Sequence, residues 1–175
     1  MIVDIAQVER ALSPLVGLPL CGSSRAADLQ MFDFGGTRTR VRQFGPRKGE
    51  TAEVHDFSLH VQCGWRVRGP AGIVVGATDL RYRSGDDPYG DDNDWDYQLT
   101  GASRRDQRIA AWLRGAPFEV LRVHADEVGG CVIELAGRFT LDVFPEHSLD
   151  GEYSEHWRLL RPDSHCVVSG RGIDD

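Results

Sequence analysis

Lysine is almost absent from this sequence of 175 residues, in which Lys48 is the only one and arginine supplies every other basic side chain. Acidic residues outnumber basic residues by 27 to 20, which gives a net charge of -7 and a pI near 5.3. Phosphate contacts require a basic surface, so this balance argues against a nucleic-acid partner. An acidic surface is instead suited to a basic protein partner.

Long apolar runs are also missing, since none reaches the roughly 18 residues needed to span a bilayer. The N-terminal MIVDIAQVER has no basic region followed by an apolar stretch, so we expect neither a signal peptide nor a membrane partner. The cysteines form no C-x-x-C pair, which favours reduced thiols and a cytoplasmic protein; they are Cys21, Cys63, Cys131 and Cys166.

Motifs that carry chemistry are lacking as well. The six histidines form no H-E-x-x-H or His-x-His pair, and the sequence contains no G-x-S-x-G, P-loop or G-x-G-x-x-G. His165 and Cys166 are adjacent and would point to opposite faces of a strand, so we do not expect them to share a metal. We expect no metal and no cofactor, and we favour a non-enzyme while leaving an enzymatic activity open.

What the sequence does contain is period-two alternation over DFSLHVQCGWRVR, residues 56–68, which predicts a half-buried antiparallel strand. A Gly-Pro turn and a second apolar run follow, so residues 56–83 are predicted to form a long hairpin. Residues 27–34 predict another strand, and the Gly-rich residues 36–52 predict a mobile loop or a weak hairpin.

Two amphipathic helices are predicted from their caps and apolar stripes. Asp4 with Gln7 and Ser103 with Asp106 each match a capping box. The first helix is expected to end near residues 11–13, where Pro14 and Gly17 follow.

Five short strands follow the second helix, and no strand–helix–strand repetition is found. We therefore expect one α+β domain over residues 1–175, built as a curved antiparallel sheet or partial β-barrel with one or two short helices packed on it. Residues 170–175 are expected to fray.

An aspartate cluster occupies SGDDPYGDDNDWDYQ, residues 84–98; its members are Asp86, Asp87, Asp91, Asp92, Asp94 and Asp96. An EF-hand loop needs Gly at position 6 and a bidentate Glu at position 12, and registers that start at Asp91 or Asp92 supply neither. We predict a mobile, solvated connector in which Trp95 is buried and the carboxylates meet a basic partner. A weak, irregular Ca²⁺ or Mg²⁺ site remains an alternative.

A second candidate site is the polar face of the strand at residues 56–68, from which His60, Gln62 and Arg66 project. If the strand at residues 27–34 pairs alongside, then Asp28 and Gln30 join this set on a sheet face that could bind a small molecule. A plain solvent-facing sheet surface gives the same pattern and is the simpler interpretation.

Three stretches together resemble a family of conserved bacterial proteins of unknown function: LPLCGSSRAADLQMFDFG at 18–35, FSLHVQCGWR at 57–66, and VFPEHS with EHWRLL within 143–160. The resemblance covers most of the chain. It implies a single cytoplasmic domain and brings no catalytic residues.

The sequence favours a non-enzymatic binding or interaction module, and an immunity-type protein that masks a basic partner is one concrete form. The alternative is a small-molecule binder or an enzyme that uses a concave sheet face with His60, Gln62 and Arg66. A homodimer stays open as a state of assembly, and neither ligand nor reaction is predicted.

Overall fold

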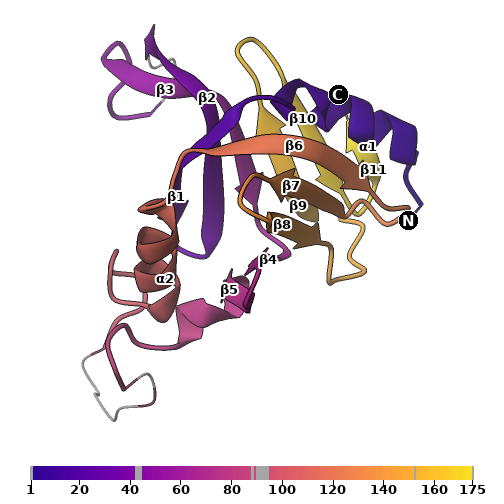
Figure 1. The fold of residues 1–175 in the computed structure, drawn as a ribbon. Helices are drawn as coiled ribbons and strands as arrows, with labels where there is room; N and C mark the ends of the chain where they lie inside the picture. Colours follow the sequence, from indigo (N-terminus) through magenta and orange to yellow (C-terminus); the bar gives the residue numbers. More distant parts are fainter. Residues whose placement is uncertain (1, 42–44, 88, 90–94, 152, 175) are drawn as a thin grey trace.

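The computed structural model describes residues 2–41, 45–87, 89, 95–151 and 153–174, which fold into an antiparallel sheet with two short α-helices (Figure 1). The predicted α+β class is confirmed at this level. The sheet does not close into a barrel, because β11 and β5 are its two edges. No helix in these residues is long and apolar enough to cross a membrane.

The described residues contain two α-helices, two 3₁₀ helices and eleven strands, in the chain order α1 (Ile5–Leu12), η1 (Ser13–Leu15), β1 (Pro19–Ala26), β2 (Leu29–Val41), β3 (Thr51–Val61), β4 (Gly64–Gly69), β5 (Gly72–Gly76), η2 (Ala77–Arg81), α2 (Arg104–Leu113), β6 (Phe118–Ala125), β7 (Cys131–Leu135), β8 (Phe139–Phe144), β9 (Glu155–Leu160), β10 (His165–Ser169) and β11 (Gly172–Asp174).

Strands that are distant in the sequence pair within this sheet, whose order is β11-β10-β9-β3-β2-β1-β6-β7-β8-β4-β5. β1 pairs with β6 through Leu20 and Phe118, and β3 pairs with β9 through Leu59 and Leu159. β3 and β4 follow each other in the chain but are not neighbours in the sheet. The sheet must therefore bend between them.

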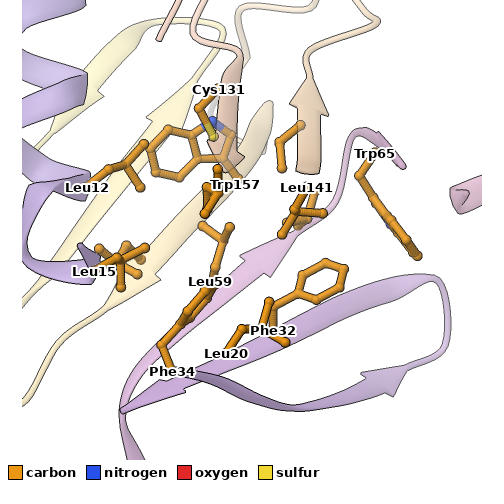
Figure 2. Packing of buried hydrophobic residues seen from close by; sticks show 14 of the residues in the cluster. Leu12, Leu15, Leu20, Phe32, Phe34, Leu59, Trp65, Cys131, Leu141 and Trp157 are labelled. Atoms are coloured by element: carbon orange, nitrogen blue, oxygen red, sulfur yellow. The ribbon is translucent and has the colours of Figure 1, made fainter. Parts of the chain in front are cut away.

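The bend brings the inner faces of the two halves together over one core. Phe32 of β2 and Trp65 of β4 meet edge to face, with ring centroids 5.1 Å apart, although their strands are not paired. Leu59 and Trp157 are fully buried in the same cluster, and Leu12 of α1 joins them (Figure 2). Burial of these large side chains is the main source of stability for such a sheet.

The alternation predicted for residues 56–68 is confirmed, but the single long strand is wrong. Its apolar positions from Leu59 to Val67 are buried and Phe57 is half-buried. Pairing nevertheless breaks at Gln62 and Cys63, whose amides both donate to the carbonyl of His156 at 2.9 and 3.1 Å. Gly64 then starts β4 where a Cβ would lie 2.4 Å from the Phe144 ring. Because glycine has no side chain, the chain can pass close to Phe144 as it leaves β3, which pairs with β9, and enters β4, which pairs with β8.

The hairpin predicted over residues 56–83 is shorter than expected at both ends. The hairpin is β4 with β5, and it ends at Gly76. Asp79 Oδ2 accepts a hydrogen bond from the Gly76 amide at 2.9 Å, which turns the chain into η2 instead of extending the strand.

Residues 36–52 contain strand, as the weak-hairpin alternative predicted. β2 and β3 continue to pair from Thr37 with His55 to Val41 with Thr51. In the described residues this part has no further sheet neighbour, since β1 pairs with β2 only as far as Phe34. The result is a two-stranded extension of the sheet (Figure 1). β1 and β11 were not predicted.

Both helices begin where the caps predict. Asp4 Oδ1 accepts from the Ala6 amide at 2.9 Å, whereas Gln7 contributes its backbone amide to Asp4 O. The second capping box is confirmed in full, because Ser103 and Asp106 each bind the other's backbone amide. α2 contacts η2, the edge strand β5 and the central strand β1.

Candidate functional site

The chain between η2 and α2, which holds the predicted aspartate cluster, is closed at its base by backbone hydrogen bonds. The Ser84 amide donates to Ala102 O at 2.9 Å, and the Arg104 amide donates to Tyr82 O at 2.7 Å. Its two ends are thereby held side by side. We name residues 82–103 the acidic–aromatic loop, and every statement on it concerns residues 82–87, 89 and 95–103.

Arg25 of β1 anchors this loop to the sheet. Its Nη2 donates to Tyr97 O at 2.9 Å and to Leu99 O at 2.8 Å, and its Nε donates to Asp106 Oδ1 at 2.6 Å. The Arg25 side chain is only 4% exposed, so the charge is held in a fixed position. A buried, saturated guanidinium of this kind fixes the backbone that it binds.

A second arginine, Arg105 of α2, is buried. This burial lowers its pKa to about 10. Arg105 donates to Ala27 O at 3.2 Å and Asp28 O at 3.1 Å, and its guanidinium lies 5.9 Å from the Trp65 ring centre. These contacts tie α2 to the turn between β1 and β2. The predicted site residue Asp28 lies exposed on that turn.

Apolar and aromatic side chains point outward from the anchored loop. Tyr89 is 81% exposed, Leu99 62% and Tyr97 44%. Tyr82 joins Tyr89 edge to face, with ring centroids 5.5 Å apart. Tyrosine is enriched at the centre of protein interfaces because it offers a large amphipathic surface with few rotatable bonds.

Trp95 is half-buried rather than buried as predicted. Its Nε1 donates to Ala102 O at 3.0 Å, and its ring lies 6.4 Å from that of Tyr97. The predicted anchoring role is thus met by a contact within the loop. The indole does not reach the main core cluster.

Carboxylates are close to these aromatic residues in the chain. Asp86, Asp87 and Asp96 are exposed, and in the described residues no cation lies within ion-pair distance of them. Asp87 and Asp96 each accept a hydrogen bond from a backbone amide two residues further on. The other predicted members, Asp91, Asp92 and Asp94, lie outside the described residues.

The second predicted site is not brought together by the fold. Gln30 faces the core and is 2% exposed, with Nε2 donating to Ser23 Oγ at 2.8 Å and to Ser24 O at 2.9 Å. His60 neighbours Met31 in the sheet, one position along β2 from Gln30, and therefore faces the opposite side of the sheet.

The remaining members of that set diverge further. Burial and the nearby Arg158 lower the pKa of His60, so its imidazole is neutral at pH 7. Gln62 is exposed where β3 ends, and Arg66 lies on β4 beside Asp142. Because β3 and β4 are not sheet neighbours, His60 and Arg66 do not line one face in the way we expected.

A thiol–imidazole pair formed by residues of β1 and β3 was missed by the sequence analysis. Cys21 sits at a bulge of β1, with its Sγ 3.4 Å from His55 Nδ1. Asp33 lies alongside and accepts from Ser58 Oγ at 2.7 Å. Burial and Asp33 raise the pKa of Cys21, so the thiol stays protonated at neutral pH and is not a prepared nucleophile.

Among the described residues, no group of three or more His, Cys, Asp or Glu side chains is arranged to hold a metal ion. The acidic–aromatic loop combines exposed apolar and aromatic side chains with exposed carboxylates, so we treat it as the candidate binding surface. Comparisons of the chain with protein-family models, with curated proteins and with solved structures found no match.

Proposed function

We propose that the protein is a non-enzymatic binding module whose acidic–aromatic loop docks on a basic protein partner. The observation that carries this proposal is the exposure of Tyr89, Tyr97 and Leu99 among carboxylates, on a loop whose base is anchored by Arg25. An immunity-type protein that masks a basic toxin is one concrete form of such a module.

The anchored base supports binding by limiting the entropy lost on association. Hydrogen bonds from Arg25 hold the carbonyls of Tyr97 and Leu99, and backbone bonds join the two ends of the loop. Side chains that are positioned before binding lose less freedom when a partner arrives. The exposed tyrosines supply the contact area that dominates the affinity of most interfaces.

The carboxylates support a basic partner in particular. Asp86, Asp87 and Asp96 add to a chain whose net charge is -7, and charge of one sign speeds the encounter with a partner of the other sign. The same charges disfavour acidic proteins and nucleic acids. We therefore expect an association rate that falls steeply as salt increases.

Photo-crosslinking in the native host tests the proposal. A photoreactive amino acid at position 89 should capture a basic protein, and the double variant Asp86→Lys/Asp87→Lys should lose it. The variant Glu119→Lys/Glu127→Lys is the control, because it makes the same change of charge at exposed positions on and after β6. Equal capture by both variants, or capture of an acidic protein, would contradict the proposal.

The captured protein is then purified, and its association rate is measured by stopped flow. Tyr89→Ala and Tyr97→Ala should each raise the dissociation constant at least 10-fold, which corresponds to about 1.4 kcal/mol. Tyrosine variants that leave the dissociation constant unchanged would show that the partner binds elsewhere.

A further inference from the structure

A pocket of about 310 Å³ lies on the face of β4, β8, β7 and β6 that points away from the core. It is distinct from the acidic–aromatic loop. By strand register, six of its lining residues point to this outer face: Arg66, Arg68, His124, Val132, Asp142 and Phe144. We propose that this pocket binds a small monocarboxylate with an apolar body.

Two arginines converge on a single carboxylate at one end of the pocket. Arg66 Nε donates to Asp142 Oδ2 at 2.9 Å, while Arg68 donates to Asp142 through Nε at 2.6 Å and through Nη2 at 2.8 Å. Burial alone would raise the pKa of Asp142, but hydrogen bonds from Arg68 and Arg66 outweigh it and lower the pKa. Two cations thus share one anion.

Both guanidinium groups retain donors for a ligand. Within the described residues, Arg66 gives only its Nε to a protein acceptor, and Arg68 leaves Nη1 unused. Their side chains are 46% and 47% exposed, whereas that of Asp142 is 8% exposed. The planar fork of a guanidinium matches a carboxylate, and such charge-assisted bonds are stronger than neutral ones.

The apolar part of the lining favours an organic anion over an inorganic one. Phe144 lies beneath the Arg66 guanidinium, which is 5.5 Å from the ring centre, and Val132, which pairs with Asp142 and so points to the same face, continues the apolar wall. The volume is at the small end of the range for ligand pockets. It suits a ligand about the size of a single ring.

Asp126 sets the number of negative charges that the pocket accepts. It lies on the turn after β6, separated from β4 by β7 and β8, and its Oδ1 accepts from the amides of Gly130 at 2.7 Å and Val128 at 3.0 Å. Those bonds keep its charge in place. A ligand with a second carboxylate at its far end would meet this charge, so a monoanion is preferred.

Titration of the full chain with benzoate at low salt, followed by two-dimensional NMR, tests the proposal. Benzoate should give saturable shifts at the arginine Nε–H groups and at the amides of Val132 and Phe144. Benzamide, which has the same shape without the charge, should bind at least 10-fold more weakly. Terephthalate and inorganic phosphate should also bind more weakly than benzoate.

Arg66→Gln and Arg68→Gln should each weaken benzoate binding by about 10-fold or more, since each removes a charged donor. Arg122→Gln is the matched control, because Arg122 is an exposed arginine of β6 outside the pocket lining. Arg66→Lys keeps the charge but loses the fork, and it should retain part of the affinity. The dispersed amide spectrum of each unliganded variant reports whether it is folded.

Several results would overturn the proposal: no saturable benzoate shifts, equal binding of benzamide, preference for phosphate or terephthalate, or equal weakening by Arg122→Gln.

Discussion

Asp106 joins the helix cap of α2 to the anchor of the acidic–aromatic loop, so its replacement tests both. Its Oδ2 accepts from the Ser103 amide at 3.3 Å and from the Gly101 amide at 3.1 Å. Its Oδ1 accepts from Arg25 Nε at 2.6 Å, and Oδ2 accepts from Arg25 Nη2 at 2.9 Å. Exposed fractions of 4% for Arg25 and 13% for Asp106 make this a buried pair.

Asp106→Asn should destabilise the protein by about 3–5 kcal/mol, because it leaves the Arg25 charge buried without a counter-charge. For a protein of this size, that loss corresponds to a fall in Tm of roughly 6–20 °C. The amide of asparagine can still act at the helix cap, so the loss reports mainly on the ion pair.

Urea unfolding followed by circular dichroism measures this loss. Asp86→Asn is the matched control, since Asp86 is exposed in the same loop, and it should stay within about 0.5 kcal/mol of the parent protein. The double variant Arg25→Met/Asp106→Asn should be more stable than the sum of the single variants predicts, because no charge is then left unpaired. Additive single effects, or an unchanged stability in Asp106→Asn, would refute the reasoning.

The same pair gives a pH dependence of defined sign. Burial alone would raise the pKa of Asp106, but hydrogen bonds from Arg25 and Ser103 outweigh it and lower the pKa. The stabilisation is therefore fully present above the unfolded-state pKa of about 3.9 and is lost as the pH falls through the lower folded-state pKa. The difference in stability between the parent protein and Asp106→Asn should shrink in that acidic window, and a constant difference from pH 7 to pH 2 would contradict this assignment.

Further predictions concern the thiols, one close backbone approach and the core. In native protein one thiol, that of the half-buried Cys21, should react with an aromatic disulfide reagent before the other three, which are buried; its rate should increase with pH because its raised pKa keeps it protonated at neutral pH, and two or more thiols reacting together would contradict this. Gly170→Ala should lose about 1–3 kcal/mol in urea unfolding, since its Cβ would lie 1.8 Å from Leu149 O, whereas Gly151→Ala should be near neutral because nothing lies within 4 Å. Leu59→Ala should lose about 2–5 kcal/mol by the same assay, because the side chain is fully buried, and a loss below about 1 kcal/mol would refute its place in the core.

Local signals in the sequence predicted the elements whose causes are local. The Ser103–Asp106 capping box and the alternation around Leu59 depend on neighbours a few residues away, and both are found. β1 was missed because PLCGSSRA has no alternation, and its strand form depends on pairing with β2 and β6. The break at Gln62 was missed for the same reason, since it depends on the distant carbonyl of His156.

In the candidate site, too, features with local causes could be predicted and features that depend on distant residues could not. The aspartates and their place before α2 could be predicted from sequence, whereas the element before them is η2 and not the predicted strand. The placement of Leu99 could not be predicted, because its carbonyl is held by Arg25, which is more than 70 residues away in the chain. Arg66 was predicted to lie on one sheet face with His60 and Gln62. It instead forms an ion pair with Asp142 of β8, because the bend of the sheet pairs β4 with β8.

The strand order also determines when the protein can fold during its own synthesis. β1, β2 and β3 are made first, yet the sheet neighbour of β3 on its other side is β9, which begins at Glu155. About 100 further residues must be made before that edge is covered, which takes roughly 5–20 s at 5–20 residues per second. Throughout that interval the nascent chain has an unpaired β3 edge and an uncovered Leu59 side chain. Strands of other chains can pair with such an edge, which leads to aggregation. The ribosome-bound protein is thus expected to depend on chaperones until its last strands emerge.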